Sequence, residues 1–279
     1  MEQLASQQER LRWLIDWLIA EDPRWAEARA AGELAVPQDA QARCRLYRSL
    51  VNVREPRAAS AEYLQVEDAY LRQRLRERGA VPLHEVRAAS AAAGVPGPDL
   101  LLWQGDITRL ALDGIVNAAN EQLLGCFAPC HGCIDNAIHT GAGVRLRLAC
   151  AELMVAQGAP EPTGRAKITP GFNLPAAHVL HTVGPIVQGP LPTARDRANL
   201  ASCYRACLDL AAADGLSSVA FCCISTGEFR FPQREAARIA VDTVRAWQAA
   251  AAERGGPVPV VVFDVFKDAD LAIYQRLLR

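Results

Sequence analysis

From residue 100 onward, short apolar runs alternate with longer amphipathic segments, and this alternation constrains the fold more than any other feature of the sequence. The apolar runs predict strands at residues 100–103, 114–117, 177–182, 219–225 and 258–265. The amphipathic segments predict helices at residues 134–155, 197–213, 233–252 and 268–278. Strands that alternate with helices predict an α/β fold, in which a mostly parallel sheet carries helices on both faces. Ligands of such sheets bind beyond the carboxyl ends of the strands.

Residues 1–98 have a different pattern, which is helical throughout. Apolar side chains recur at helical spacing in the first segment, as in Leu11, Leu14 and Ile15. Further helices are predicted at about residues 41–53 and 60–78. The stretch Gly94-Val95-Pro96-Gly97-Pro98 is typical of a linker or a sharp turn. The sequence therefore predicts a helical N-terminal extension over residues 1–98 and an α/β domain over residues 99–279.

The overall charge is nearly balanced, because 30 lysines and arginines face 31 aspartates and glutamates. Binding to nucleic acid as a main function requires a positive excess, so that class is disfavoured. No run approaches the roughly 20 apolar residues of a membrane span. The first residues, MEQLASQQERLRW, lack the basic start and apolar block of a signal peptide. We therefore expect a cytoplasmic protein with no membrane partner.

Three predicted strands are followed at once by polar or glycine-containing segments. The first segment contains Asp106, whose carboxylate could cap a helix or accept a hydrogen bond from an amino group such as that of adenine. The second places Asn117 and Asn120 on either side of two alanines, a pattern that suits either a turn or binding to sugar hydroxyls. The third, residues 225–232, is either an ordinary strand-to-helix turn or a backbone site for an anion.

Nine cysteines on a chain without a secretion signal argue against a disulfide framework, and one group of them is unusual. Cys126, His131 and Cys133 lie within eight residues, and Pro129 and Gly132 bend the chain between them. Thiolate and imidazole are the ligands that Zn²⁺ prefers, and three protein ligands with an open fourth position are typical of a catalytic site. A structural zinc site and a set of free thiols remain alternatives.

Two further residues that could bind metal lie near this cluster. Cys130 could replace Cys126 as a ligand. His139 lies two turns into the following helix, where a supporting or core role is the simpler interpretation. Cysteines in apolar runs are expected to be buried as small hydrophobic side chains; these are Cys203, Cys207, Cys222 and Cys223.

Taken together, these segments resemble the macrodomain family and in particular its zinc-containing microbial branch. The likeness rests on the turn 105–108, the asparagine motif 117–120, the helix start 134–139 and the loop 225–232, in that order, with the cysteine–histidine cluster between them. The helical stretch 62–71 is also similar to the extension of this branch. The resemblance implies a macrodomain fold that binds ADP-ribose.

The resemblance also implies roles for single residues. Asp106 and Ile107 would contact the adenine, and Asn117 and Asn120 would face the distal ribose. Asp135 matches the acid of the related MacroD-type hydrolases, so that Asp135 and Asn120 are the expected catalytic residues. The diphosphate loop would comprise Ser225, Thr226, Gly227, Glu228 and Phe229. Arg230 departs from the pattern, because a small residue is expected at its position.

The activity implied by the resemblance is hydrolysis that removes mono-ADP-ribose from modified proteins, with cleavage at the distal ribose, and acidic side chains are the expected attachment points. Zn²⁺ held by Cys126, His131 and Cys133 would act on a ribose oxygen or on water. Within the zinc-containing branch the substrate is often a lipoyl-carrier protein modified by a sirtuin-type transferase. Two other functions remain open: a reader module that binds ADP-ribose without cleavage, and a deacetylase of O-acetyl-ADP-ribose.

Overall fold

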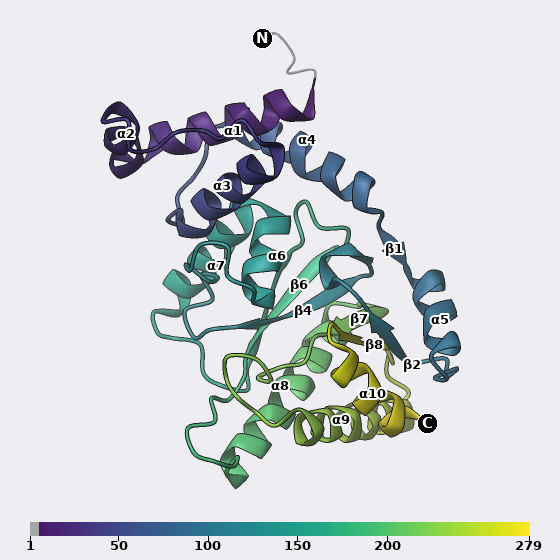
Figure 1. Ribbon diagram of the computed structural model, residues 1–279. Helices are drawn as coiled ribbons and strands as arrows, with labels where there is room; N and C mark the ends of the chain where they lie inside the picture. The colour runs from purple at the N-terminus through teal and green to yellow at the C-terminus, as the bar shows by residue number, and fades with distance from the viewer. Residues whose placement is uncertain (1–5) are drawn as a thin grey trace.

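The computed structural model describes residues 6–279 (Figure 1). The first five residues of the segment interpreted above as lacking a signal peptide lie outside this range. Six strands form the main sheet in the order β2-β8-β7-β4-β6-β5, and only the β5–β6 pair is antiparallel. Their bounds are β2 Leu100–Gln104, β4 Gly114–Ala119, β5 Ala166–Pro170, β6 His178–Val183, β7 Ser218–Phe221 and β8 Val260–Val265.

Helices cover this sheet on both faces, as the sequence predicts. Figure 1 shows α8, α9 and α10 grouped on one side of the strands and α6 and α7 on the other. The bounds of these helices are α6 Ile134–Ala142, α7 Val144–Gln157, α8 Ala194–Ala213, α9 Gln233–Glu253 and α10 Asp268–Leu278. The prediction of a mostly parallel, doubly covered sheet is therefore confirmed. Its central strands are almost completely buried, which explains why they form continuous apolar runs in the sequence.

The single helix predicted over residues 134–155 is two helices, because the chain breaks at Gly143. This glycine has a φ of +90°, a conformation that side chains rarely adopt. A Cβ atom at this position would also lie 2.6 Å from Oε2 of Glu67. The chain therefore requires glycine here, because the side chain of Glu67, from a distant part of the sequence, approaches the backbone closely.

The sequence prediction also missed strand β5. This strand lies at the edge of the sheet and pairs with β6 alone. It ends on Pro170, and only Thr169 among its five residues is buried. Edge strands tolerate proline and need few apolar side chains, so β5 lacks the pattern of the central strands.

The N-terminal helices form a second, smaller core beside the sheet domain. They are α1 Gln7–Glu21, α2 Pro23–Ala30, α3 Ala40–Val53 and α4 Ala61–Arg78. Their buried side chains pack together with Val144 at the start of α7. By contrast, α5 Leu83–Ala92 packs on β2, and β1 Val81–Pro82 pairs with β3 Leu110–Ala111. We propose that the chain divides into a helical extension and a macrodomain, as the sequence predicts. Residues 81–95 belong to the predicted extension by sequence, but they pack on the macrodomain.

One buried carboxylate joins the two cores. Glu67 on α4 is fully buried, and its Oε1 accepts hydrogen bonds from the hydroxyls of Tyr47 (2.9 Å) and Tyr63 (3.0 Å). Its Oε2 accepts a bond from the backbone N–H of Val144 (3.0 Å), the first residue of α7. Burial raises the pKa of Glu67, and the three donors oppose that rise. Within residues 6–279, no helix is both long and apolar enough to cross a membrane.

Replacing Glu67 with alanine should therefore destabilise the protein strongly. Glu67→Ala leaves two tyrosine hydroxyls and one backbone N–H buried without acceptors, and each such group costs about 1–3 kcal/mol. We expect the free energy of unfolding, measured in urea, to fall by at least about 3 kcal/mol. Glu62→Ala, at an exposed position of the same helix, should change it by less than about 0.5 kcal/mol. Equal losses in both variants would contradict the proposed junction.

Candidate active site

The polar segments singled out from the sequence meet at one edge of the sheet. Strands β2, β8, β7 and β4 are parallel neighbours, so their carboxyl ends lie side by side. Asp106 follows β2, Asn117 and Asn120 lie at the end of β4, and the loop containing Ser225 follows β7. Phe266 comes directly after β8 with 75% of its side chain exposed. This aromatic was not singled out from the sequence, where nothing distinguishes it from a core phenylalanine.

Asp106 lies in a turn where both of its carboxylate oxygens have partners. Oδ1 accepts from the backbone N–H (3.0 Å) and the hydroxyl (2.6 Å) of Thr108, so it caps the short helix Ile107–Arg109. Oδ2 pairs with Arg78 from the end of α4. Gly105 has no room for a side chain, because the ring of Trp103 fills the place of a Cβ atom. The side chain of Ile107 is buried in the larger core.

The loop of residues 225–229 has the geometry of an anion site. Ser225 has a φ of +64°, and the backbone N–H groups of Gly227, Glu228 and Phe229 donate to no acceptor within the part of the chain that the structure describes. Successive free N–H groups after a left-handed residue form a concave nest for anions. The hydroxyl of Ser225 is buried and lacks a partner among the same residues. Arg230, the departure from the family pattern, has a φ of +57°, where glycine would be less strained.

The donor atoms of Cys126, His131 and Cys133 lie within 4.8 Å of one another. Sγ of Cys126 is 3.6 Å from Nδ1 of His131. Sulfur and nitrogen ligands of one tetrahedral zinc ion should be about 3.6 Å apart, given the usual bond lengths of about 2.3 Å and 2.0–2.1 Å. The residues present therefore fit a tetrahedral metal ion. Cys130 points elsewhere, because its thiol donates to the carbonyl of Arg45 (3.3 Å) and it is absent from the group.

Glu228 connects the anion loop to this cluster. Its Oε1 lies 3.5 Å from Nε2 of His131, the ring nitrogen that does not face Cys126. Metal-binding histidines commonly donate this second N–H to a carboxylate, which fixes the tautomer and the ring orientation. The structure thus places Glu228 beside His131 as well as in the loop that the sequence assigned to the diphosphate.

Asp135 lies at the start of α6, two residues after Cys133, and is 5% exposed. Its Oδ1 accepts from Nδ2 of Asn117 (2.8 Å) and lies 3.5 Å from Nε2 of His139. Burial raises the pKa of Asp135 to about 6, and the bond from Asn117 and the charge of Arg147 lower it. Asn117 is itself fully buried beneath Asp135, whereas Asn120 is half-buried and holds the carbonyl of Gly125 (3.2 Å).

A buried group of His139, Cys150 and His181 lies below this acid, and its spacing could also suit a metal ion. The hydrogen bonds favour a different role. Asn117 Nδ2 can only donate, so Nδ1 of His181 is the acceptor in their 3.2 Å contact. A neutral His181 then carries its proton on Nε2 and donates it to Thr169 (2.9 Å). That nitrogen has no lone pair for a metal, and the group is better described as a polar support beneath Asn117.

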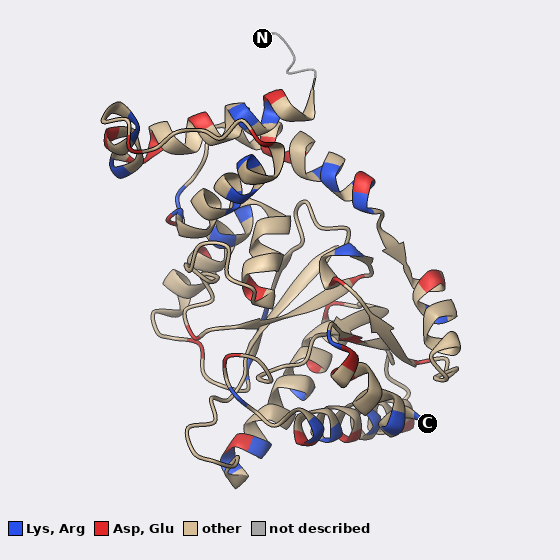
Figure 2. Cartoon of the chain, viewed as in Figure 1, with Lys and Arg blue, Asp and Glu red and all other residues tan. Residues whose placement is uncertain are grey.

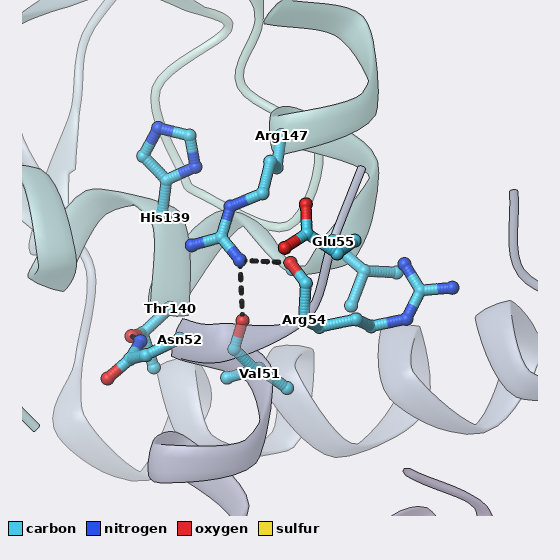
Figure 3. A pocket seen from close by; sticks show the side chains of 9 residues that line it. Val51, Asn52, Arg54, Glu55, His139, Thr140 and Arg147 are labelled. Carbon is cyan, nitrogen blue, oxygen red and sulfur yellow. Dashed lines mark hydrogen bonds between the residues drawn. The ribbon is translucent and has the colours of Figure 1, made fainter. Parts of the chain in front are cut away.

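Side chains from outside the loop hold the metal-ligand segment in place. Nη2 of Arg48 on α3 donates to the carbonyl of His131 (2.8 Å), and Oδ1 of Asn52 accepts from the N–H of Cys130 (2.9 Å). Nε of Arg147 on α7 donates to the carbonyl of Leu124 (2.6 Å). Figure 3 shows the same guanidinium bonded to the carbonyls of Val51 and Arg54 in the extension. Sequence analysis did not identify these supports.

Comparisons with known proteins agree with this fold. The family model described as "Macro domain" matches residues 116–240. A protein-ADP-ribose hydrolase of Treponema medium is 47% identical over 98% of this chain and 99% of its own length. A protein of the same name from Staphylococcus aureus is 44% identical over 99% of this chain and 97% of its own length.

Solved structures of macrodomains are also similar to this chain. The Trypanosoma brucei macrodomain in complex with ADP-ribose is 30% identical, with a TM-score of 0.62, over 83% of this chain and 95% of that one. The Oceanobacillus iheyensis macrodomain with ADP is 39% identical, with a TM-score of 0.57, over 64% of this chain and 89% of that one. The fold and the site thus define a macrodomain. The chain belongs to the macrodomain family, and its full-length relatives place it among the protein-ADP-ribose hydrolases.

Proposed function

We propose that this protein is a zinc-dependent hydrolase that removes mono-ADP-ribose from modified proteins, with cleavage at the distal ribose. The observation that carries the proposal is the convergence of Cys126, His131 and Cys133 beside the buried carboxylate of Asp135. Full-length similarity to protein-ADP-ribose hydrolases supports the reaction class. Binding of ADP-ribose alone would not require three metal ligands next to an acid.

The proposed zinc ligands are Sγ of Cys126, Nδ1 of His131 and Sγ of Cys133. When bound there, Zn²⁺ supplies Lewis acidity to a ribose oxygen or to water. Glu228 orients His131 through Nε2, and the backbone N–H of Asn136 donates to Sγ of Cys133 (3.4 Å). These contacts fix two of the three ligands before any ion arrives, which reduces the entropy lost on binding.

Asp135 is the proposed group that accepts a hydrogen bond from the attacking water. Asn117 holds this carboxylate from below, and His181 in turn fixes the amide of Asn117. Asn120 reaches the loop at Gly125 and is proposed to act at the same end of the ligand. Water adds its oxygen to the ribose carbon or to the acyl carbon of the linkage. Attack at the ribose carbon expels the carboxylate of the protein, whereas attack at the acyl carbon expels the ribose oxygen, which takes a proton. Both routes give the free carboxyl group and ADP-ribose.

The rest of the ligand lies along the sheet edge in this proposal. The free N–H groups of residues 227–229 receive the diphosphate. Asp106 and the backbone at Ile107 contact the adenine, which stacks on the exposed ring of Phe266. The likeness of the extension and the metal loop to the zinc-containing branch supports a lipoyl-carrier protein, modified by a sirtuin-type transferase, as the cytoplasmic substrate.

Metal content tests the proposed ligands directly. The purified protein should contain about one zinc ion per chain by elemental analysis, since the described residues offer one such open site. Cys133→Ala should lose most of this zinc, because two ligands hold the ion poorly. Cys130→Ala is the matched control and should keep it, since that thiol bonds to Arg45 instead. Full activity in metal-free protein would exclude the zinc mechanism.

Calorimetry with ADP-ribose tests the adenine contact. Asp106→Ala removes a charged acceptor, and a hydrogen bond to a charged group is worth about 1.5–3 kcal/mol, so affinity should fall by roughly 10- to 150-fold. Asp99→Ala, at the opposite end of the same strand, provides the control and should bind normally. An unchanged affinity for Asp106→Ala would place the adenine elsewhere.

Substitution of Asp135 distinguishes a hydrolase from a reader module that binds ADP-ribose without cleaving it. Asp135→Ala should lower turnover of a protein ADP-ribosylated on acidic side chains by about 10²–10⁴-fold. Affinity for ADP-ribose should change much less, because the adenine and diphosphate contacts lie away from this residue. Thermal melting and zinc content should be measured for the same sample, so that loss of folding is recognised. A wild-type protein that binds ADP-ribose, contains zinc and turns over no substrate would be a reader.

A further inference from the structure

A pocket of about 280 Å³ lies between the N-terminal extension and the macrodomain. Helices α3 and α4 form one wall, and Thr108, Leu174 and α6 form the other. The α6 residues at this wall are Ala137, Thr140 and Gly141, which lie on the opposite side of the helix from Asp135 and His139. Helix α6 therefore separates this pocket from the proposed catalytic carboxylate, and Asp106 is the one lining residue of the pocket that the proposed adenine site also uses.

The charges around the pocket are strongly unbalanced. Four arginines line it, namely Arg45, Arg48, Arg74 and Arg78, and Asp106 is the one carboxylate among the lining residues. Asp106 pairs with Arg78. The other three guanidinium groups have no carboxylate partner in the described part of the chain. Several unneutralised positive charges in one recess repel one another, and they create a potential that attracts anions.

The three arginines without a carboxylate partner do not use all of their N–H donors in contacts with the described part of the protein. Arg48 donates to the neutral oxygens of His131 and Asn136, and Arg74 donates to the hydroxyl of Tyr70 (3.0 Å). The guanidinium of Arg45 makes no hydrogen bond or ion pair within residues 6–279. Figure 2 shows the basic residues along α3 and α4. Each guanidinium has five N–H donors in a planar fork, so unused donors remain on all three.

We propose that this pocket is a binding site for a small phosphorylated molecule. Guanidinium forks match the oxygens of a phosphate group, and a phosphate monoester carries about −1.5 to −2 charges, which would neutralise roughly half to two thirds of the charge of the three arginines. Leu71, Leu75 and Leu174 supply apolar surface for the remainder of the ligand. The volume lies just below the usual range of about 300–1,000 Å³ for ligand pockets, so the ligand is small.

Calorimetric titration with inorganic phosphate tests this site in the full-length zinc-loaded protein. Saturating ADP-ribose is added first so that, if the proposed function is correct, the catalytic cleft and its anion loop are already occupied. We expect one phosphate per chain under these conditions. Arg45→Gln and Arg74→Gln should each weaken this binding about tenfold or more. Arg76→Gln is the matched control on α4, because that residue is exposed and does not line the pocket.

Arg45→Gln is the decisive variant, because the guanidinium of Arg45 makes no hydrogen bond or ion pair within residues 6–279 and the substitution is therefore expected to change stability little. Arg48 is left intact because it supports the metal loop. Failure of ADP-ribose to bind would count against the proposed function alone, since the comparison of arginine variants still reports on the pocket. Phosphate binding that is unaffected by Arg45→Gln and Arg74→Gln would overturn the proposal. Equally tight binding of glutarate would overturn the assignment to phosphates, as would preferential binding of an acidic peptide.

Discussion

The loop that carries the metal ligands depends on hydrogen bonds from side chains outside it. Between residues 124 and 133, one backbone–backbone bond joins two loop residues, from His131 to Ala128 (3.2 Å). The carbonyls of Leu124 and His131 and the N–H of Cys130 are bonded by Arg147, Arg48 and Asn52. A loop with so little structure of its own would otherwise sample many conformations. Together with Asn120 and Asn136, which donate to the carbonyls of Gly125 and Ala128, these three side chains restrict the loop to a conformation in which the ligands converge.

Much of the fold could be predicted from local sequence patterns. The central strands are buried on both faces and form continuous apolar runs, so β2, β4, β6, β7 and β8 were expected close to their observed positions. The convergence of Cys126, His131 and Cys133 was also predictable, because eight residues with a proline and a glycine can fold back on themselves. What could not be predicted depends on residues distant in sequence. Gly143 breaks a helix because of Glu67, and Arg48 supports a loop 83 residues away.

The two ends of the proposed ligand site differ physically. At the adenine end, Asp106 and Phe266 are supplied by loops at the ends of β2 and β8, and Arg78 of the extension pairs with Asp106. At the ribose end, Asp135 is fixed by a chain of buried polar groups through Asn117 and His181 to Thr169. These hydrogen bonds restrain the carboxylate, while Oδ1 of Asn117 is buried without a partner among the described residues. Recognition thus relies on the sheet edge, and the chemistry relies on the interior and on the extension.

This difference has a consequence for any fragment that begins at residue 99. Such a fragment would keep the backbone nest, but it would lose Arg78, which pairs with Asp106, and residues 81–95, which pack on the macrodomain. It would also lose Arg48, Asn52 and the carbonyls of Val51 and Arg54 that hold Arg147. The extension therefore supports both the metal-ligand loop and the turn at Asp106. The helices before residue 81 are thus a structural part of the loop that carries the proposed metal ligands, although none of them supplies a ligand.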